Sequence, residues 1–298
     1  MKIITLGPAG TYGHEATEAV LDWLFLEHSV KPDIEFVPRN IEILNSVSKT
    51  QNLGVVPIEN STEGLVSEVI KGFWLRQADN EVARPPIYVV GETKIPIRHQ
   101  LLVHPSINRI EELTAVASHT QALGQCKENL DRLGLMIRKP TNSTAAAAQS
   151  VANDLAFRTT GAIASRFAGK VYGLKALQEN LEDFPGNATR FHIVGPAPKR
   201  TVSENNRTAL LFWVPNKPRS LLNALWSIGM EEVNMSSIHS IPLGSRGQYA
   251  FYCEFDCHTK TDVGRKIIER MRTVVDRLFI LGSYPQEIDE GKEVNNAG

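Results

Sequence analysis

A regular alternation of short apolar runs with segments of helical spacing most constrains the fold of this 298-residue chain. Runs typical of strands lie at 2–6, 34–37 and 53–57, and between them apolar residues recur every three or four positions, as on one face of a helix. This order predicts a βαβαβ unit. Such alternation is typical of parallel strands covered by helices, so we predict an α/β fold.

The same alternation continues to about residue 194. Further strands are expected at 86–91, 100–104, 115–118, 135–138, 161–164 and 188–194, and helices at 121–133 and 144–152. A chain of this length with 42% hydrophobic residues can bury a sizeable core and divide into two or three compact units. Residues 1–195 are assigned to the first part of the molecule.

The composition changes near residue 196. Residues 196–206 are rich in Pro and polar residues without periodicity, which predicts a linker. Residues 207–284 then follow the order strand, helix, strand, strand, helix, strand of a ferredoxin-like βαββαβ unit. Residues 285–298 are mostly polar, and a flexible tail is expected there.

The bulk charge argues against several classes of function. Lys and Arg number 32 against 33 Asp and Glu, a net charge of −1, so the chain lacks the charge typical of nucleic-acid or membrane-surface binding. We find no secretory signal or membrane-spanning apolar segment. A small-molecule partner is therefore favoured.

The three cysteines, Cys126, Cys253 and Cys257, are too few and odd in number for a disulfide framework, which indicates a reducing, cytoplasmic location. Cys253, Cys257 and His258 lack a second pair to complete a tetrahedral metal site. No metal is expected.

Polar clusters follow several predicted strands, where open α/β folds bind ligands. The first, Gly7-Pro8-Ala9-Gly10-Thr11-Tyr12, leaves backbone N–H groups and the Thr11 hydroxyl free to face an anion at a helix N-terminus. Its glycine spacing matches neither the dinucleotide-binding nor the Walker pattern. An ordinary strand-to-helix turn would use the same glycines, and this alternative stays open.

A second cluster, Pro57-Ile58-Glu59-Asn60-Ser61-Thr62, places a carboxylate, an amide and two hydroxyls side by side. Glu59 and Asn60 are expected to face the ligand. Ser61 or Thr62 could instead cap a helix beginning near residue 65, and both roles are compatible because a cap uses one side-chain oxygen.

Ser118-His119-Thr120-Gln121 ends another predicted strand and opens a helix, with Gln125 on the same face as Gln121. A hydrolase interpretation would make Ser118 a nucleophile with His119 as its base. Adjacent residues rarely face each other, however, and the glycines of a nucleophile elbow are absent.

Ser143 and Thr144 open a further helix, as a plain cap or as an anion site.

The last cluster, Thr189-Arg190-Phe191, lies on the predicted strand 188–194. The other clusters supply neutral donors and one acid, whereas a ligand carboxylate needs positive charge. Arg190 or a helix N-terminus is expected to supply it, with an ordinary surface arginine as the alternative.

In order and spacing, these clusters resemble the motifs of prephenate dehydratases that carry a C-terminal ACT regulatory domain. The family's Gly-Pro-x-Gly-Thr opening corresponds to 7–11, its Pro-Ile-Glu-Asn-Ser box to 57–61, its Ser-His-x-Gln-x-x-x-Gln-Cys box to 118–126, its Ser-Thr-x-Ala-Ala box to 143–147 and its Thr-Arg-Phe signature to 189–191. The resemblance covers nearly the whole chain, and five boxes in order are very specific.

The resemblance implies two periplasmic-binding-protein-like lobes at 1–195 with the substrate between them, and an ACT domain at 207–284. It implies conversion of prephenate to phenylpyruvate, water and CO₂ in L-phenylalanine biosynthesis, without a cofactor. It places catalysis on Thr189, Glu59, Asn60, Ser118 and Gln125, and substrate contacts on Thr11, Ser61, Thr62, Ser143, Thr144, Arg190 and Phe191. A homodimer or homotetramer is expected, and no mutase activity, because no chorismate mutase helices precede the first strand.

The reaction needs a proton or a strong hydrogen bond on the departing hydroxyl. Thr189 is a poor proton source alone, so we expect Glu59, with its pKa raised by burial, or a bound water to support it.

The predicted ACT domain departs from the family. Arg219-Ser220-Leu221 stands where the family has Gly-Ala-Leu, and His239-Ser240-Ile241-Pro242 where it has Glu-Ser-Arg-Pro. In the family these boxes form a phenylalanine site at a subunit interface. A bulky arginine in a position of close backbone approach argues against that pocket, so phenylalanine inhibition is expected to be absent or replaced by another effector. If Arg219 points to solvent, the pocket survives.

Other functions stay open. Two α/β lobes with hydroxyl-lined strand ends also describe a sensor that binds an aromatic acid without turning it over. A nearer alternative is a related enzyme that acts on arogenate, or one that decarboxylates prephenate without aromatisation.

Overall fold

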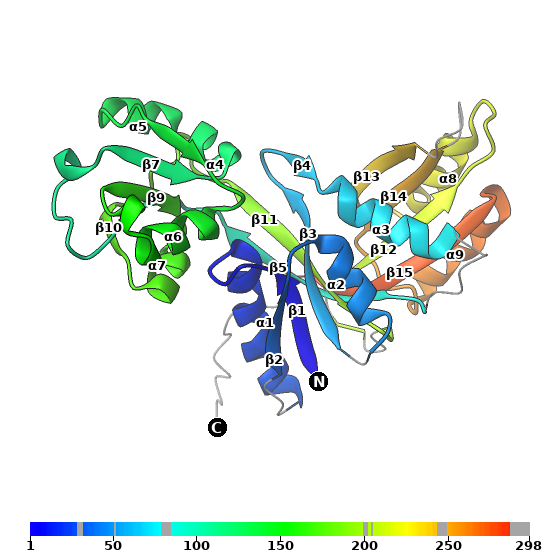
Figure 1. Ribbon diagram of the computed structural model, residues 1–298. Coiled ribbons are helices and arrows are strands. Elements are labelled where there is room, and N and C mark those ends of the chain that lie inside the picture. Colours follow the sequence, from blue (N-terminus) through cyan, green and yellow to red (C-terminus); the bar gives the residue numbers. More distant parts are fainter. Residues whose placement is uncertain are drawn as a thin grey trace, which may run out of the picture.

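The computed structural model describes residues 1–28, 32–50, 52–78, 85–198, 202–203, 205–242 and 249–286. Its strands form three sheets, one in each of three bodies that follow one another across Figure 1. The second lobe lies at the left in green, the first lobe in the centre and the C-terminal unit at the right. Residues 287–298 of the predicted tail lie outside the described residues.

The first lobe contains a sheet with strand order β2-β1-β3-β11-β5, to which β4 adds on β3. Its elements are β1 (Lys2–Leu6), α1 (Tyr12–His28), β2 (Asp33–Val37), α2 (Asn40–Val47), β3 (Leu53–Asn60), β4 (Gly64–Leu65), α3 (Ser67–Ala78), β5 (Tyr88–Pro96) and β11 (Ala188–Gly195). Apolar residues of α1 pack with Ile3 and Val55 in one cluster, and those of α2 and α3 pack with Ile4 and Val56 in another. The sheet is thus covered by helices, as predicted.

The prediction of purely parallel sheets is wrong. The pairs of β1 with β2 and β3 are parallel, but β11 runs antiparallel to both β3 and β5. Strand β11 enters this sheet from the second lobe, so its direction is not set by a strand–helix–strand crossover.

The second lobe contains a five-stranded sheet of order β10-β6-β9-β7-β8, also mixed. Its elements are β6 (Gln100–Val103), η1 (Ile110–Glu112), β7 (Ala115–Ser118), α4 (Thr120–Gln125), α5 (Lys127–Arg132), β8 (Arg138–Pro140), α6 (Thr144–Asn153), η2 (Leu155–Phe157), β9 (Thr160–Ala164), α7 (Arg166–Tyr172) and β10 (Lys175–Gln178). The helix predicted at 121–133 is divided at Cys126, whose backbone leaves the helical region. The two-lobed α/β prediction is confirmed.

The C-terminal unit has the predicted βαββαβ order and an antiparallel sheet of order β13-β14-β12-β15. Its elements are β12 (Asn206–Trp213), α8 (Ser220–Gly229), β13 (Met235–Pro242), β14 (Tyr249–Phe255), α9 (Asp262–Val274) and β15 (Arg277–Pro285). Asn206 and Pro285 pair with each other, so the sheet takes one residue from the predicted linker and one from the predicted tail.

The C-terminal unit is joined to the first lobe by a common apolar core. Tyr252, Leu281 and Tyr284 belong to the cluster that contains Ile4 of the first lobe. At Gly282 a Cβ atom would lie only 2.0 Å from the carbonyl oxygen of Val89, so β15 approaches β5 more closely than any larger residue permits. The C-terminal sheet and the sheet of the first lobe are therefore in direct backbone contact.

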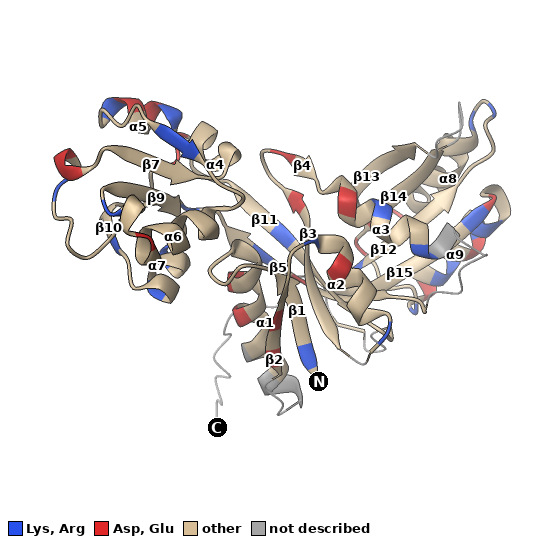
Figure 2. Ribbon diagram, viewed as in Figure 1, with Lys and Arg blue, Asp and Glu red and all other residues tan. Residues whose placement is uncertain are grey.

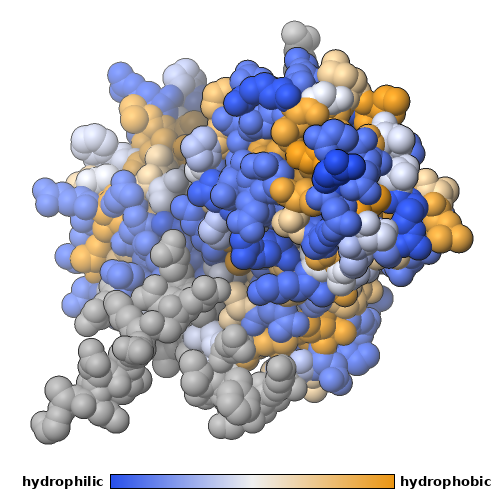
Figure 3. Space-filling model, turned by 90° about the vertical axis from the view of Figure 1, so that its left-hand side faces the viewer, coloured by the Kyte–Doolittle hydropathy of each residue, from blue (hydrophilic) through white to orange (hydrophobic). Residues whose placement is uncertain are grey.

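The surface carries charges of both signs on all three bodies (Figure 2). Seen from the side of the second lobe, it is largely hydrophilic, with apolar patches interrupted by polar side chains (Figure 3). Within the described ranges, no helix combines the length and apolar character needed to cross a bilayer.

Candidate active site

A cavity of about 300 Å³ lies between the two lobes. The first lobe contributes the turn between β1 and α1 and one face of β3 and β11, and the second lobe contributes the starts of α4 and α6. The polar residues that line it are Thr11, Tyr12, Asn60, His99, His119, Gln121, Gln125, Asn142, Ser143, Thr144, Asn187 and Thr189. The sequence-predicted residues Thr11, Asn60, Gln125, Ser143, Thr144, Thr189 and Phe191 are thus brought together.

Asn60 and Thr189 form the centre of this cavity wall. The amide nitrogen of Asn60 donates to Oγ1 of Thr189 over 2.9 Å and lies 3.3 Å from the carbonyl oxygen of Ala188. Its Oδ1 accepts three hydrogen bonds, from both the amide and the hydroxyl of Thr62 and from the amide of Glu63, which fixes the orientation of the side-chain amide. Because the Thr189 oxygen already accepts a hydrogen bond, its own proton remains available to a ligand.

A second group of polar residues surrounds His99. Its Nε2 lies 3.1 Å from Oε1 of Gln125, which also accepts from the amide of Asn187 over 3.3 Å. On the other side of the ring, the Tyr12 hydroxyl lies 3.3 Å from Nδ1. Burial lowers the pKa of His99, opposed by the bond to Gln125 and the charge of Glu182, so the imidazole is neutral at neutral pH.

Sequence reasoning assigned no role to Tyr12, His99 or Asn187. His99 and Asn187 directly precede β6 and β11, near the two passages of the chain between the lobes. A search for polar residues at the starts of predicted strands, and not only at their ends, would have found His99 and Asn187.

Two helices of at least ten residues begin at the cavity. Helix α1 starts at Tyr12 and α6 at Thr144, and the first N–H groups of a helix have no intrahelical acceptor. Ser143 Oγ accepts from the Ala146 amide over 3.0 Å, so Ser143 is a cap. The other N–H groups at this N-terminus remain free to bind an anion. Among the described cavity-lining residues there is no Lys, Arg, Asp or Glu.

The turn before α1 satisfies most of its own polar groups. Thr11 Oγ1 donates to the carbonyl oxygen of Leu6 over 2.8 Å and accepts from the His14 amide over 3.1 Å. The Gly10 amide donates to Nδ1 of His14, and the left-handed φ of 84° at Gly10 favours glycine. The glycines therefore form an ordinary strand-to-helix turn, as the alternative held, while Thr11 forms part of the cavity wall.

Ser118 does not line the cavity. It is fully buried, and its hydroxyl donates to the carbonyl oxygen of Ile163 over 2.5 Å. The hydrolase interpretation is wrong, because this hydroxyl has no access to a substrate. Cys126 at the end of the same motif is also buried, and burial raises its pKa, so the motif's cysteine contributes to the core.

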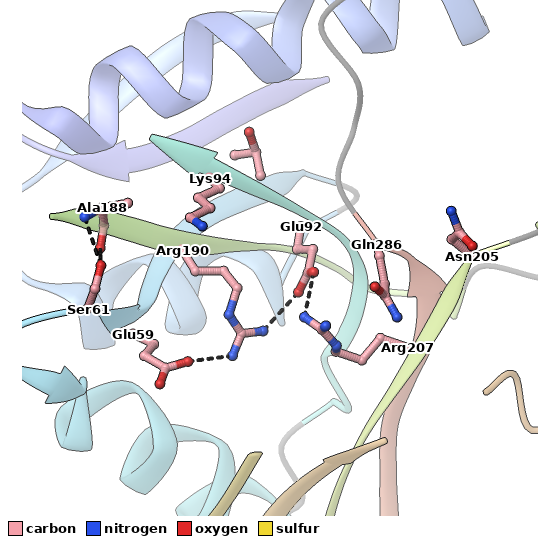
Figure 4. Close-up of a pocket in the computed structure, with 10 residues that line it drawn as sticks. Glu59, Ser61, Glu92, Lys94, Ala188, Arg190, Asn205, Arg207 and Gln286 are labelled. Atoms are coloured by element: carbon pink, nitrogen blue, oxygen red, sulfur yellow. Dashed lines mark hydrogen bonds and ion pairs between the residues drawn. The ribbon is translucent and has the colours of Figure 1, made fainter. Parts of the chain in front are cut away.

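Glu59 and Arg190 also lie outside the cavity. Both border a different cavity, of about 460 Å³, on the reverse face of β3 and β11 (Figure 4). Arg190 binds Glu59 there over 2.9 Å. The expectation that Arg190 and Glu59 face the substrate is wrong, because adjacent strand residues point to opposite faces and their neighbours Thr189 and Asn60 take the face of the cleft.

Ser61 and Thr62 serve the backbone and the lobe contact. Ser61 neither caps a helix nor lines the inter-lobe cavity; it exchanges hydrogen bonds with the backbone of Ala188. The Thr62 hydroxyl lies 3.4 Å from the amide nitrogen of Gln125 across the lobe boundary. The predicted cap near residue 65 is wrong, because β4 intervenes and α3 begins at Ser67.

The residues considered for metal and effector binding lie elsewhere. No group of three or more His, Cys, Asp or Glu that could hold a metal is present in the part of the chain that the structure describes. Arg219 precedes α8 with a left-handed φ of 69° and is exposed. Ser220 and Leu221 start α8, and His239 and Ser240 lie on β13.

Comparisons with known proteins identify the relatives of this chain. A family model of prephenate dehydratase matches residues 3–199. A prephenate dehydratase of Methanocaldococcus jannaschii is 33% identical over 282 residues, which cover 93% of this chain and 96% of that protein. An arogenate dehydratase/prephenate dehydratase of Arabidopsis thaliana is 34% identical over 248 residues, which cover 78% of this chain and 60% of that protein.

Among solved structures, a prephenate dehydratase from Arthrobacter aurescens in complex with L-Phe aligns with a TM-score of 0.81 and 25% identity. The alignment covers 96% of this chain and 90% of that one. The chain therefore belongs to the prephenate dehydratase family.

Proposed function

We propose that the inter-lobe cavity converts prephenate to phenylpyruvate, CO₂ and water, with Thr189 as the residue that binds the leaving hydroxyl. The observation that carries this proposal is the hydrogen bond from Asn60 to Thr189. It occupies one lone pair of the hydroxyl oxygen and leaves the Thr189 proton free to donate to a ligand in the cavity. A donor held in this way costs no reorganisation during the reaction.

The chemistry requires little more than such a donor. The bond between the ring carbon and its carboxylate breaks, and the electron pair moves through the diene as the opposite C–O bond breaks. The ring becomes aromatic, CO₂ leaves, and the departing hydroxide takes a proton to become water. With Glu59 on the reverse face of the sheet, we assign the final proton to bulk solvent, so each turnover consumes one solvent proton, with Thr189 stabilising the oxygen as its charge develops.

The cavity also suits the two carboxylates of prephenate. The N-termini of α1 and α6 offer backbone N–H groups and positive potential to one carboxylate. With no Lys or Arg among the described lining residues, the second carboxylate gains no ion pair. A poorly stabilised ring carboxylate favours loss of CO₂.

The charge of the lining also favours prephenate over arogenate. Arogenate carries an ammonium group where prephenate has a keto oxygen, and the described lining contains no Asp or Glu to pair with it. The Thr189 donor also argues against a sensor that only binds an aromatic acid, because a pure binder needs no group on a leaving hydroxyl.

The test is steady-state turnover of prephenate and arogenate by the wild type, Thr189→Val and Thr189→Ser. We expect prephenate to be preferred. We expect valine to lower kcat about 100-fold with little change in KM, because one transition-state donor is lost, and serine to retain most of the rate. Undiminished turnover by Thr189→Val would contradict the assignment, and binding without turnover by the wild type would support the sensor.

We propose that residues 1–195 form the catalytic domain and 207–284 an ACT regulatory domain. The named Arthrobacter relative binds L-Phe, but here Arg219-Ser220-Leu221 and His239-Ser240 replace the family's effector boxes. We therefore propose a weak or absent response to phenylalanine. The three free cysteines are compatible with a cytoplasmic enzyme of phenylalanine biosynthesis.

We also propose that the protein is a homodimer through α8. Leu222 and Trp226 of this helix and Met230, directly after its end, recur every four residues along one face and are 58%, 63% and 53% exposed. An apolar face of this kind is suited to a symmetric contact with a second copy.

A further inference from the structure

Arg190 is the meeting point of three carboxylates from three strands. Its Nη2 lies 2.9 Å from Glu59 on β3 and 2.7 Å from Glu254 on β14, and its Nη1 lies 2.9 Å from Glu92 on β5. Figure 4 shows the bonds to Glu59 and Glu92. A guanidinium has a planar fork of five donors, so it can satisfy all three at once.

This cluster is largely withdrawn from water. The side chain of Arg190 is 14% exposed, that of Glu92 is 3% exposed and that of Glu254 is fully buried. Burial would lower the pKa of Arg190, but the charges of Glu254 and Glu92 raise it well above its ordinary value. The arginine is always charged, and loss of its contacts would leave carboxylates buried without a cation.

The cluster is built directly behind the proposed catalytic pair. In the ladder between β11 and β3, Thr189 pairs with Asn60 and Arg190 pairs with Glu59. The Asn60–Thr189 pair faces the cleft between the lobes, and the Glu59–Arg190 pair faces the C-terminal unit. Immediately afterwards the register with β3 shifts by one residue, whereas the pairing of Thr189 with β5 is regular, so the side of the strand that carries the Asn60 contact is the less regularly paired one.

Glu254 connects this position to the C-terminal sheet. It lies on β14, where its carboxylate also contacts His192 at 3.2 Å and the hydroxyls of Tyr252 and Tyr284. Burial alone would raise the pKa of Glu254, but its contacts with His192 and Arg190 hold it well below the usual range, so it is ionised. The C-terminal unit thus presents a fixed anion to the reverse side of Thr189's strand.

We propose that Arg190 is a positioning residue that fixes the Asn60–Thr189 pair from the reverse face of the sheet and makes turnover depend on the C-terminal unit through Glu254. The catalytic consequence rests on the proposed prephenate dehydratase activity. The structural consequence, a β11 strand held in place by Glu254, does not.

The experiment compares Arg190→Lys and Glu254→Gln with Arg207→Gln. Lysine keeps the charge but cannot reach three carboxylates in fixed geometry. Arg207 also joins the first lobe to the C-terminal unit, because it binds Glu92 over 2.7 Å. Its loss disturbs the Glu92 that it shares with Arg190 but leaves the bonds of Arg190 to Glu59 and Glu254 in place, so it is the control for those two bonds. Each protein is assayed for kcat, KM, melting temperature and amide hydrogen exchange of the segment 186–191.

We expect Arg190→Lys and Glu254→Gln each to lower kcat about tenfold, with KM for prephenate within about twofold, and to speed exchange in that segment. The double variant should lose no more than the more affected single variant, because both remove one contact. Arg207→Gln should lower the melting temperature while kcat and exchange stay near wild type.

Equal kcat losses in Arg207→Gln, or unchanged exchange at 186–191 in Arg190→Lys, would overturn the proposal. If the wild type turns over no prephenate, the proposed function fails, and the exchange measurement still decides whether Arg190 positions the strand. Should Glu254→Gln not fold, Glu254→Asp, which keeps the buried charge but shortens its reach to Arg190, supplies the same comparison.

Discussion

The amide of Asn60 and the hydroxyl of Thr189 are joined by a 2.9 Å hydrogen bond between strands β3 and β11, although the two residues are 129 positions apart in the chain. The donor is the Asn60 nitrogen, because its oxygen is occupied by Thr62 and Glu63. The Thr189 hydroxyl therefore accepts from Asn60 and keeps its own proton for a ligand. This directionality is a property of an amide that a carboxylate would not reproduce.

Asn60→Asp tests this directionality. The aspartate retains the acceptor for Thr62 and Glu63 but replaces the donor to Thr189 by a second acceptor, so the Thr189 proton would turn toward Asp and away from the substrate. We expect kcat to fall about 100-fold, as for loss of the donor itself, with the melting temperature little changed. A variant with wild-type kcat would show that Thr189 is not oriented by Asn60.

His99 makes stability depend on pH. Burial lowers its pKa in the folded protein relative to an unfolded value of about 6.5, so the unfolded state binds more protons below that pH. Stability should therefore fall as the pH drops below about 6.5 and level off below the folded pKa. We expect His99→Gln to lose less melting temperature than the wild type between pH 7.5 and pH 5, because the variant lacks this proton uptake on unfolding.

The comparison of two pH profiles isolates His99, because His14 and His258 also have pKa values lowered by burial and remain in both proteins. Parallel profiles for the wild type and His99→Gln would mean that His99 does not contribute to acid sensitivity.

Arg219 holds a backbone conformation that costs a non-glycine residue about 1 kcal/mol or more. Arg219→Gly should raise the free energy of unfolding by about 1 kcal/mol, as measured by urea denaturation. Ser220→Gly, one position further on inside α8, is the control and should lower stability. A destabilising Arg219→Gly would indicate that the arginine side chain makes a contact worth more than the strain.

Phenylalanine should leave the turnover rate unchanged, because the Glu and Arg of the family's effector box are replaced by His239 and Ile241. The measurement is the initial rate with prephenate below KM over a wide range of phenylalanine concentrations. Ordinary saturable inhibition would show that the effector pocket survives with Arg219 at its edge.

Trp226→Glu should convert a dimer to a monomer, because it places a charge in the centre of the exposed apolar face of α8. Light scattering coupled to size-exclusion chromatography measures the mass. Lys266→Glu, on the neighbouring helix α9, is a control for a change of charge on an exposed side chain. A wild type that is monomeric, or a Trp226→Glu dimer, would exclude this interface.

The sequence by itself determined the elements and the motifs. Local periodicity predicts both the strand–helix alternation up to residue 194 and the βαββαβ order beyond it. The periodicity is local because each helix or strand buries the apolar side chains of one of its own faces. The family resemblance placed the motifs at 57–61 and 189–191 around one substrate, and in the structure they lie on the paired strands β3 and β11.

Tertiary structure alone decided which motif residues share the cleft. In a strand, neighbours such as Thr189 and Arg190 point to opposite faces, but which face borders the cleft depends on β11 returning from the second lobe to lie antiparallel between β3 and β5. That pairing joins residues more than 90 positions apart and leaves no local periodicity in the sequence. The roles expected of Arg190 and Glu59 were therefore misplaced, because the contacts that orient a strand in a sheet are long-range.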